Sequence, residues 1–121
     1  RLYVANWFDR RVEVVDRDAA AVSGHFAVGN VPAGLAIAPG GEWLAVANRD
    51  DDELQLIGLP DGKTLARVQV GHAPFGVTVS DDGRLLFTAN VQSDDVSIVD
   101  VATQREIARV KVGDAPYASI H

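Results

Sequence analysis

Short apolar runs separated by turn residues fill the whole chain. In residues 54–57 and 96–99 apolar and polar positions alternate or nearly so, and in 68–70 and 110–112 they alternate cleanly. The runs are rich in Val, Ile and Leu, and Gly, Pro, Asp or Asn bounds each of them, which is typical of β-strands. None of the runs reaches the length of a stable helix. The pattern therefore predicts an all-β fold.

This pattern returns at a fixed spacing of 42 residues. Three residue types keep the spacing without an insertion: Asn6, Asn48 and Asn90; Gly29, Gly71 and Gly113; and Pro32, Pro74 and Pro116. In the second unit we place strands at about residues 34–38, 43–48, 53–58 and 64–70. Four short antiparallel strands in a unit of this length make one blade of a β-propeller.

The 121 residues hold almost three such units, about 1–42, 43–84 and 85–121. We expect a single partial β-propeller domain over residues 1–121, an incomplete ring of four-stranded blades. A helical solenoid is rejected, because no stretch carries the helical apolar period without Gly or Pro. A β-sandwich is the remaining alternative, although a sandwich does not need a fixed repeat.

The register of the repeat places residue 1 at the second strand of a blade and residues 118–121 at the start of an innermost strand. His121 would then face the central channel. Three blades leave open sheet edges and faces. We therefore expect these residues to belong to a longer chain, and the remaining blades of that chain, or a second copy, to close the ring.

Composition excludes several classes of function. The formal charge of −6 argues against a nucleic-acid partner, which needs a basic surface. No apolar run is long enough for a membrane span. The chain has no Cys, which excludes a disulfide framework, a thiolate metal site and a Cys nucleophile. Phosphate-binding, dinucleotide-binding and GxSxG motifs are absent from the sequence as well.

Two stretches carry a likeness to a known family. They are 3–6 (YVAN) with 12–16 (VEVVD), and 88–90 (TAN) with 96–100 (VSIVD), each followed by a Val-Gly pair and a Pro. This succession resembles the YVTN-type β-propeller repeat over essentially the whole chain. The resemblance implies a ring of about seven blades and an exported bacterial protein of the periplasm or cell surface. Proteins similar in this way include sugar-lactone hydrolases, haem d1-binding domains and subunits of amine-oxidising enzymes.

By analogy with other propellers, two sets of loops open on the same face around the channel. The crossing loops join one blade to the next and cover residues 29–32, 71–74 and 113–116. The middle loops join the two central strands of a blade and cover residues 7–10, 49–52 and 91–94. Loops that vary on a common scaffold are where a site can form. The second position of the crossing loops is the most informative, because it is Asn30, His72 and Asp114 in turn.

These three polar side chains, together with Trp7, Phe8 and Arg49 of the middle loops, are the candidate ligand-binding residues. Adjacent aromatics at Trp7 and Phe8 suggest a stacking or partner contact, and packing against the neighbouring blade is the alternative. We interpret His72 as a hydrogen-bonding loop residue, with a general base or a metal or haem ligand as the alternatives.

The remaining polar features have structural interpretations. Gly29 and its repeat equivalents are expected to supply an unusual φ angle, and Asn6, Asn48 and Asn90 to form Asx-turns. Residues 50–53 (DDDE) lack the spacing of a calcium loop, so we interpret them as a solvated acidic turn. No catalytic residue, metal or cofactor is predicted.

The sequence defines the scaffold far better than the function. The leading hypothesis is a non-enzymatic binding module that presents a polar loop face to a protein or small-molecule ligand. The alternative, from the resemblance and from His72, is an enzyme or redox-associated propeller, either a lactone hydrolase or a subunit that supports a haem or quinone cofactor. A purely structural assembly unit is a third hypothesis.

Overall fold

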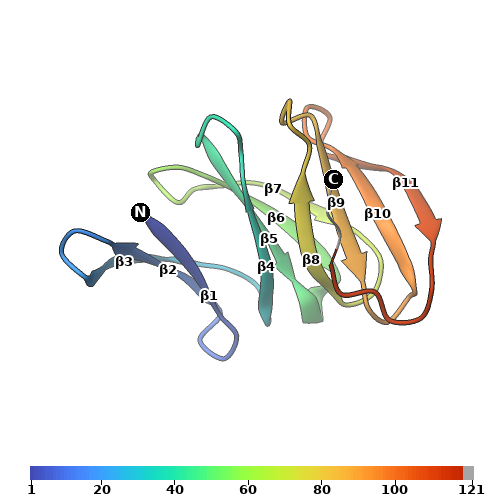
Figure 1. Ribbon diagram of the computed structural model, residues 1–121, viewed down its shortest axis with the longest axis horizontal. Coiled ribbons are helices and arrows are strands. Elements are labelled where there is room, and N and C mark those ends of the chain that lie inside the picture. Colours follow the sequence, from blue (N-terminus) through green and yellow to red (C-terminus); the bar gives the residue numbers. More distant parts are fainter. Residues whose placement is uncertain (119–121) are drawn as a thin grey trace.

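In the computed structural model, which describes residues 1–118, the chain is built almost entirely of β-strands (Figure 1). In chain order they are β1 (Leu2–Asn6), β2 (Arg11–Asp16), β3 (Ala21–Ala27), β4 (Pro32–Ile37), β5 (Trp43–Asn48), β6 (Glu53–Gly58), β7 (Thr64–Gln69), β8 (Pro74–Val79), β9 (Leu85–Asn90), β10 (Asp95–Asp100) and β11 (Arg105–Lys111). A short 3₁₀ helix, η1 (Arg49–Asp51), lies between β5 and β6. Within residues 1–118 we find no helix that is both long and apolar enough to cross a membrane.

The strands form three separate antiparallel sheets, which we call the first, second and third blades. Their strand orders are β1-β2-β3, β4-β5-β6-β7 and β8-β9-β10-β11. Figure 1 shows the blades fanning out from β1–β3 at the left to β8–β11 at the right. The predicted all-β propeller fold, as a partial ring, is therefore confirmed. The strands predicted in the second unit agree with β4 to β7 to within two residues at each end.

Within residues 1–118 the first blade has three strands, and β1 corresponds in the repeat to β5 and β9, the second strands of the other two blades. At the C-terminal end, the repeat predicts that residues 118–121 begin an innermost strand. Ala118 is outside any strand, and the rest of that segment, including His121, lies outside the described residues.

Strand pairing repeats together with the sequence. The three recurring asparagines pair with the first residue of the next strand in every blade, as Asn6 with Arg11, Asn48 with Glu53 and Asn90 with Asp95. A register shift in the pairing of the two outer strands of each blade also recurs, and it leaves one residue of the outermost strand unpaired opposite residues 14 and 15, 56 and 57, and 98 and 99. A bulge adds local twist at a defined point of a strand. The blades are thus copies in register and irregularity as well as in strand number.

The hydrophobic core lies between neighbouring blades. Successive side chains of a strand point to opposite faces of its sheet. Along β5, Leu44 and Val46 belong to the cluster shared with the first blade, while Trp43 and Ala45 belong to the cluster shared with the third. Burying a Leu or Val side chain contributes roughly 1.5–3 kcal/mol, so each blade is stabilised mainly by its neighbours.

The innermost strands β4 and β8 approach each other closely at the centre of the fan. A Cβ atom on Gly34 would collide with the carbonyl oxygen of Phe75, and one on Gly76 would lie 2.5 Å from the carbonyl oxygen of Tyr117. Glycine is needed at these positions because backbone meets backbone.

Two sheet faces at the ends of the partial ring are uncovered. Leu2 of the first blade is 51% exposed, whereas the equivalent Leu44 is 2% exposed. Val110 of the third blade is 51% exposed, whereas the equivalent Val68 is 4% exposed. In the second blade the equivalent surfaces are covered by the neighbouring blades, so the exposed residues mark the two faces that lack a neighbour.

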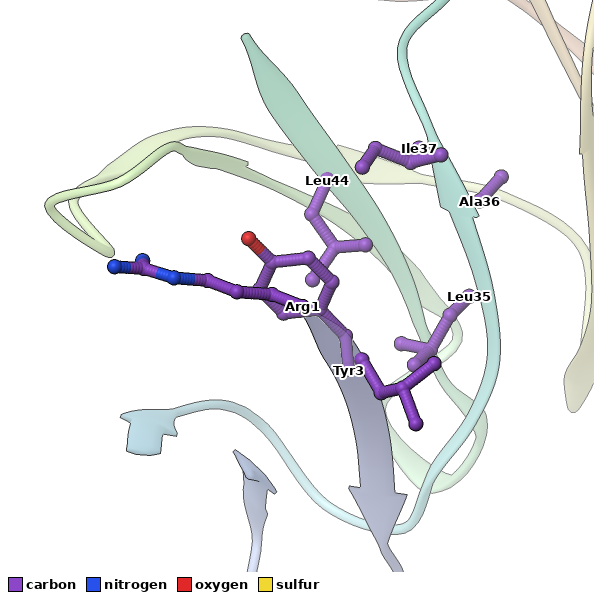
Figure 2. Close-up of a pocket in the computed structure, with 7 residues that line it drawn as sticks. Arg1, Tyr3, Leu35, Ala36, Ile37 and Leu44 are labelled. Carbon is purple, nitrogen blue, oxygen red and sulfur yellow. The ribbon is translucent and has the colours of Figure 1, made fainter. Parts of the chain in front are cut away.

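An apolar pocket of about 230 Å³ lies between the first and second blades (Figure 2). Leu2 and Tyr3 of β1, residues 35–37 of β4 and Leu44 of β5 line it. Arg1 also borders the pocket, and its side chain extends away from the apolar group. The pocket lies at the start of β1, where the other blades carry an inner strand, and away from the loop that follows Asn6.

Candidate functional site

The crossing loops and the middle loops meet along one side of the molecule, the lower edge in Figure 1. Backbone hydrogen bonds join them. Arg49 donates its N–H to the carbonyl of Val31 at 2.9 Å, and Val91 donates to the carbonyl of Ala73 at 3.0 Å, exactly one repeat later in the chain. We call this side the loop face. Because its loops are bonded to each other, it is a rigid surface on which side chains can be held in place.

Each crossing loop is also held by the middle loop of the blade that precedes it. Oδ1 of Asp52 accepts a hydrogen bond from the N–H of Ala73 at 2.9 Å, and Oδ1 of Asp94 accepts one from the N–H of Ala115 at 2.8 Å. The equivalent residue of the first blade is Arg10, whose side chain carries only hydrogen-bond donors and cannot accept the backbone N–H of the crossing loop. Its Nη1 instead donates to Oδ1 of Asn30 at 3.4 Å.

The blade that follows holds the other side of the crossing loop. Oδ2 of Asp51 accepts a hydrogen bond from the N–H of Asn30 at 2.7 Å, and Oγ of Ser93 accepts one from the N–H of His72 at 2.9 Å. Asn30 adds a side-chain bond from Nδ2 to Oδ1 of Asp51 at 2.8 Å. Each crossing loop between described blades is therefore fastened to both of them.

The expected unusual φ does not fall on the recurring glycines of the crossing loops. The left-handed residues are Val31, Ala73 and Ala115, with φ of 54°, 55° and 49°. A Cβ on Gly71 would lie 2.6 Å from Oδ1 of Asp95 and would also collide with Nδ2 of Asn90. The prediction of an unusual φ at these glycines was wrong. Close approach to neighbouring side chains requires glycine at Gly29 and Gly71, whereas no atom lies within 4 Å of a Cβ built on Gly113.

The Asx-turn interpretation holds only at the first of the recurring asparagines. Oδ1 of Asn6 accepts from the N–H of Asp9 at 3.4 Å, while Asn48 makes no such capping bond. Asn48 and Asn90 are fully buried, and the Nδ2 group of Asn48 donates to Glu53 at 2.8 Å and to Gln55 at 2.9 Å. These asparagines join the second strand to the third beneath the crossing loop.

His72 and Asp52 form the main ionisable pair of the loop face. Nδ1 of His72 lies 2.9 Å from Oδ2 of Asp52, and the His72 side chain is 67% exposed. Burial raises the pKa of the Asp52 carboxyl, but hydrogen bonds from Ala73 and His72 and the charges of His72 and Arg49 outweigh it and hold that pKa below its usual value. The imidazole is thus oriented through Nδ1 while its other nitrogen is left for solvent or a ligand.

The acidic residues 50–53 are engaged by the protein in different directions. Asp50 pairs with Arg49 at 2.8 Å, Asp51 binds Asn30, Asp52 binds the next crossing loop, and Glu53 pairs with Arg67. The segment is therefore less solvated than predicted, because three of its four carboxylates hold neighbouring elements. No cluster of three potential metal ligands occurs among residues 1–118.

Trp7 packs against residues of the third blade instead of standing alone. Its ring lies 6.0 Å from that of Phe75, at an interplanar angle of 80°. Phe75 in turn lies 5.7 Å from Tyr117, at 83°. Phe8 is 94% exposed and makes no ring contact within the part of the chain that the structure describes. Phe75 and Tyr117 were missed by the sequence analysis, although they share one repeat position with Ala33.

The six candidate residues lie on one face without forming a single cluster. Among residues 1–118, no hydrogen bond, ion pair or ring contact joins one of these side chains to another. Asn30, His72 and Arg49 are each bound to an aspartate of the middle loops. Asp114 is exposed. The structure thus brings the six candidates to the loop face, where Trp7 contacts the ring of Phe75.

The fold and the loop arrangement together define the protein as a partial β-propeller whose loops on one face are hydrogen-bonded to each other. The model of the family described as "Lactonase, 7-bladed beta-propeller" matches residues 2–111. The chain therefore belongs to this family of seven-bladed propellers. A comparison with curated proteins finds no match.

Two solved structures have the same fold. The chain is similar to hydrazine synthase of Kuenenia stuttgartiensis, with 22% identity and a TM-score of 0.90 over 96% of this chain and 34% of that chain. It is also similar to the dihydro-haem d1 dehydrogenase NirN in complex with DHE, with 23% identity and a TM-score of 0.78 over 97% of this chain and 27% of that chain. The chain thus spans about a third or less of either protein, and at these identities the likeness shows the fold alone.

Proposed function

We propose that the protein is a non-enzymatic β-propeller module that binds a protein or small-molecule ligand on its loop face. The observation that carries this proposal is the double fastening of each crossing loop, by Asp52 and Ser93 in the case of residues 71–74. A loop held from both sides presents its variable side chain at a fixed place, which lowers the entropy cost of binding. The YVTN-type repeat and an exported, periplasmic or cell-surface location belong to the same proposal and rest on the sequence resemblance.

Ligand capture with matched variants tests the binding function. Capture by the wild type should weaken when His72→Ala or Asp114→Ala is introduced in the crossing loops. Asp18→Ala, in the β2–β3 turn at the other end of the blades, is the matched control and should leave capture unchanged. If none of the three substitutions changes the amount of ligand bound, the ligand binds elsewhere and the proposal is wrong.

Lactone hydrolysis is a second candidate, favoured by the family match and by the His72–Asp52 pair. With Nδ1 donating to the carboxylate, Nε2 of His72 can take a proton from water as the water oxygen bonds to the lactone carbonyl carbon. The ring C–O bond then breaks, and the proton passes to the departing alkoxide. Measurable hydrolysis by the wild type that falls by about 100-fold in His72→Asn would establish this candidate. If the wild type hydrolyses lactones only at the background rate, this candidate is excluded and the binding function remains the proposal.

A haem- or quinone-supporting role is the remaining alternative. One of the two similar solved structures is a dihydro-haem d1 dehydrogenase, but at 23% identity it shares only the fold with this chain. An absorption spectrum of the natively purified protein in the near-ultraviolet and visible range, beyond the absorption of Trp and Tyr, tests the role directly, because haem and quinone cofactors absorb there and the unmodified side chains do not. A protein without absorption in this range excludes it.

We also propose that further blades, from the same chain or from a second copy, complete the ring. The support is the contrast between Val110, which is exposed, and its buried equivalent Val68. Mass measurement by light scattering on the purified 121-residue chain separates the two sources. A stable monomer at 12.9 kDa would exclude ring closure by a second copy.

A further inference from the structure

Three aromatic rings from separate parts of the chain gather on the loop face. Trp7 comes from the middle loop of the first blade, Phe75 from the inner strand of the third blade, and Tyr117 from the segment after the last crossing loop. We call these residues the aromatic group. Both contacts are nearly perpendicular, so in each contact one ring uses only its edge and keeps its own faces uncovered by the other.

The scaffold does not require aromatic residues at these positions. The residue equivalent to Trp7 is Arg49 in the second blade and Val91 in the third, and the residue equivalent to Phe75 is Ala33 in the second blade. All three blades nevertheless have the same strand register. The aromatic group is therefore additional to what the fold needs.

Much of the aromatic group is open to solvent. Trp7 is 44% exposed and Tyr117 is 61% exposed. Phe75 is half-buried between them. Clustered exposed aromatic surface of this kind is typical of recognition sites, because it remains unfavourable in water until a ligand covers it.

The loops around the aromatic group carry negative charge. The six crossing and middle loops contain two arginines, Arg10 and Arg49, against six aspartates: Asp9, Asp50, Asp51, Asp52, Asp94 and Asp114. Arg49 is neutralised by Asp50 at 2.8 Å. Within residues 1–118 no ion pair involves Asp114, which lies three residues before Tyr117. The loop face therefore attracts cations and disfavours anionic ligands.

We infer that the aromatic group binds a small organic cation, with an alkylammonium head against the rings. This inference rests on the proposed binding function and names the chemistry of its ligand. Aromatic faces attract ammonium groups through their quadrupole, and tryptophan does so most strongly. The surrounding aspartates add long-range attraction that salt screens. The same aspartates repel a phosphorylated or carboxylate ligand, so we expect no anion to bind at this position.

Calorimetric titration of the full chain with choline tests the inference against an uncharged isostere, 3,3-dimethylbutan-1-ol. We expect choline to bind at least about tenfold more tightly than the isostere, and more weakly as sodium chloride is raised. Equal affinity for the two probes, or no heat with choline, overturns the inference. Both measurements use the wild type, so they do not depend on the folding of a variant.

Two matched variants place the site. Trp7→Leu should weaken choline binding by about tenfold, whereas Leu65→Ala, at an exposed apolar position near the start of β7 and away from the loop face, should leave it unchanged. Equal effects of the two substitutions would overturn the assignment to these rings. Failure of the choline experiments leaves the wider proposal standing as long as ligand capture remains sensitive to His72→Ala.

Discussion

Nδ1 of His72 lies 2.9 Å from Oδ2 of Asp52, and the other oxygen of the same carboxylate accepts the N–H of Ala73 at 2.9 Å. One side chain of the second blade therefore fixes both the backbone and the variable side chain of the following crossing loop. Asp52 itself is in the left-handed region, with φ of 53°. The position of this crossing loop and the orientation of His72 therefore depend on the same residue.

Removing the charge of Asp52 should lower stability in a pH-dependent way. The pKa of the folded Asp52 is depressed, so its ionisation stabilises the fold above the unfolded-state pKa, and this contribution is lost as pH falls through the folded pKa. Asp52→Asn should cost about 1 kcal/mol at pH 7, because the side chain is partly solvated, and progressively less below about pH 4.

Urea unfolding at pH 7 and at pH 3 measures this difference. Asp50→Asn is the matched control, since the exposed Asp50 lies in the same loop and its side chain pairs only with Arg49. That substitution should change the unfolding free energy by less than about 0.5 kcal/mol. A cost for Asp52→Asn that is the same at both pH values would contradict the role assigned to its charge.

Adding a methyl group to Gly71 should destabilise the third blade. The new Cβ would meet buried side chains of Asn90 and Asp95, which are hydrogen-bonded to each other at 2.8 Å. We expect Gly71→Ala to reduce the free energy of unfolding by roughly 1–3 kcal/mol. Gly24→Ala, where no atom lies within 4 Å of the new Cβ, should be close to neutral. Thermal unfolding of the pair is the check, and similar melting temperatures would refute the close-approach explanation.

A valine-to-threonine exchange should stabilise the second blade. Thr88 donates its hydroxyl to Oδ1 of Asn90 at 3.0 Å, but the equivalent residue of the second blade is Val46, and Oδ1 of the buried Asn48 finds no donor within residues 1–118. Val46→Thr supplies the donor with little change in volume. We expect a gain of about 1 kcal/mol in unfolding free energy.

The mirror substitution provides the control for this gain. Thr88→Val should cost about 1–2 kcal/mol, because it leaves Oδ1 of Asn90 buried without a partner. Chemical denaturation of both variants gives the two values. If Val46→Thr is as harmful as Thr88→Val, the hydrogen bond does not explain the difference between the blades.

Sequence reasoning recovered the scaffold because its determinants are local and repeated. The alternation in residues 53–58 and the turn residues around them are sufficient to place β6, and the recurrence of Asn48 as Asn90 is sufficient to make the next blade a copy. Strand period and turn chemistry act within a few residues, so they can be read without knowing the neighbours.

The same reasoning missed features that depend on contacts between blades. It assigned the strained backbone to Gly71, whereas the left-handed residue is Ala73, because the packing of Asn90 under Gly71 is a three-dimensional contact. It identified Trp7 but not its partner Phe75, which reads as an ordinary strand residue. The one available signal was the Ala33, Phe75, Tyr117 variation at a single repeat position.

The most direct test of the account is a nuclear magnetic resonance titration of the isotopically labelled chain with choline. The account predicts that amide shifts are confined to the loop face: residues 7–10, 49–52, 72–75, 91–94 and 114–117. Shifts that centre on the turns at the opposite ends of the blades, such as residues 17–20 and 59–63, would contradict the loop face as the binding surface. No shifts at any concentration up to roughly 10 mM, where even very weak ligands register, would contradict the binding of an organic cation there.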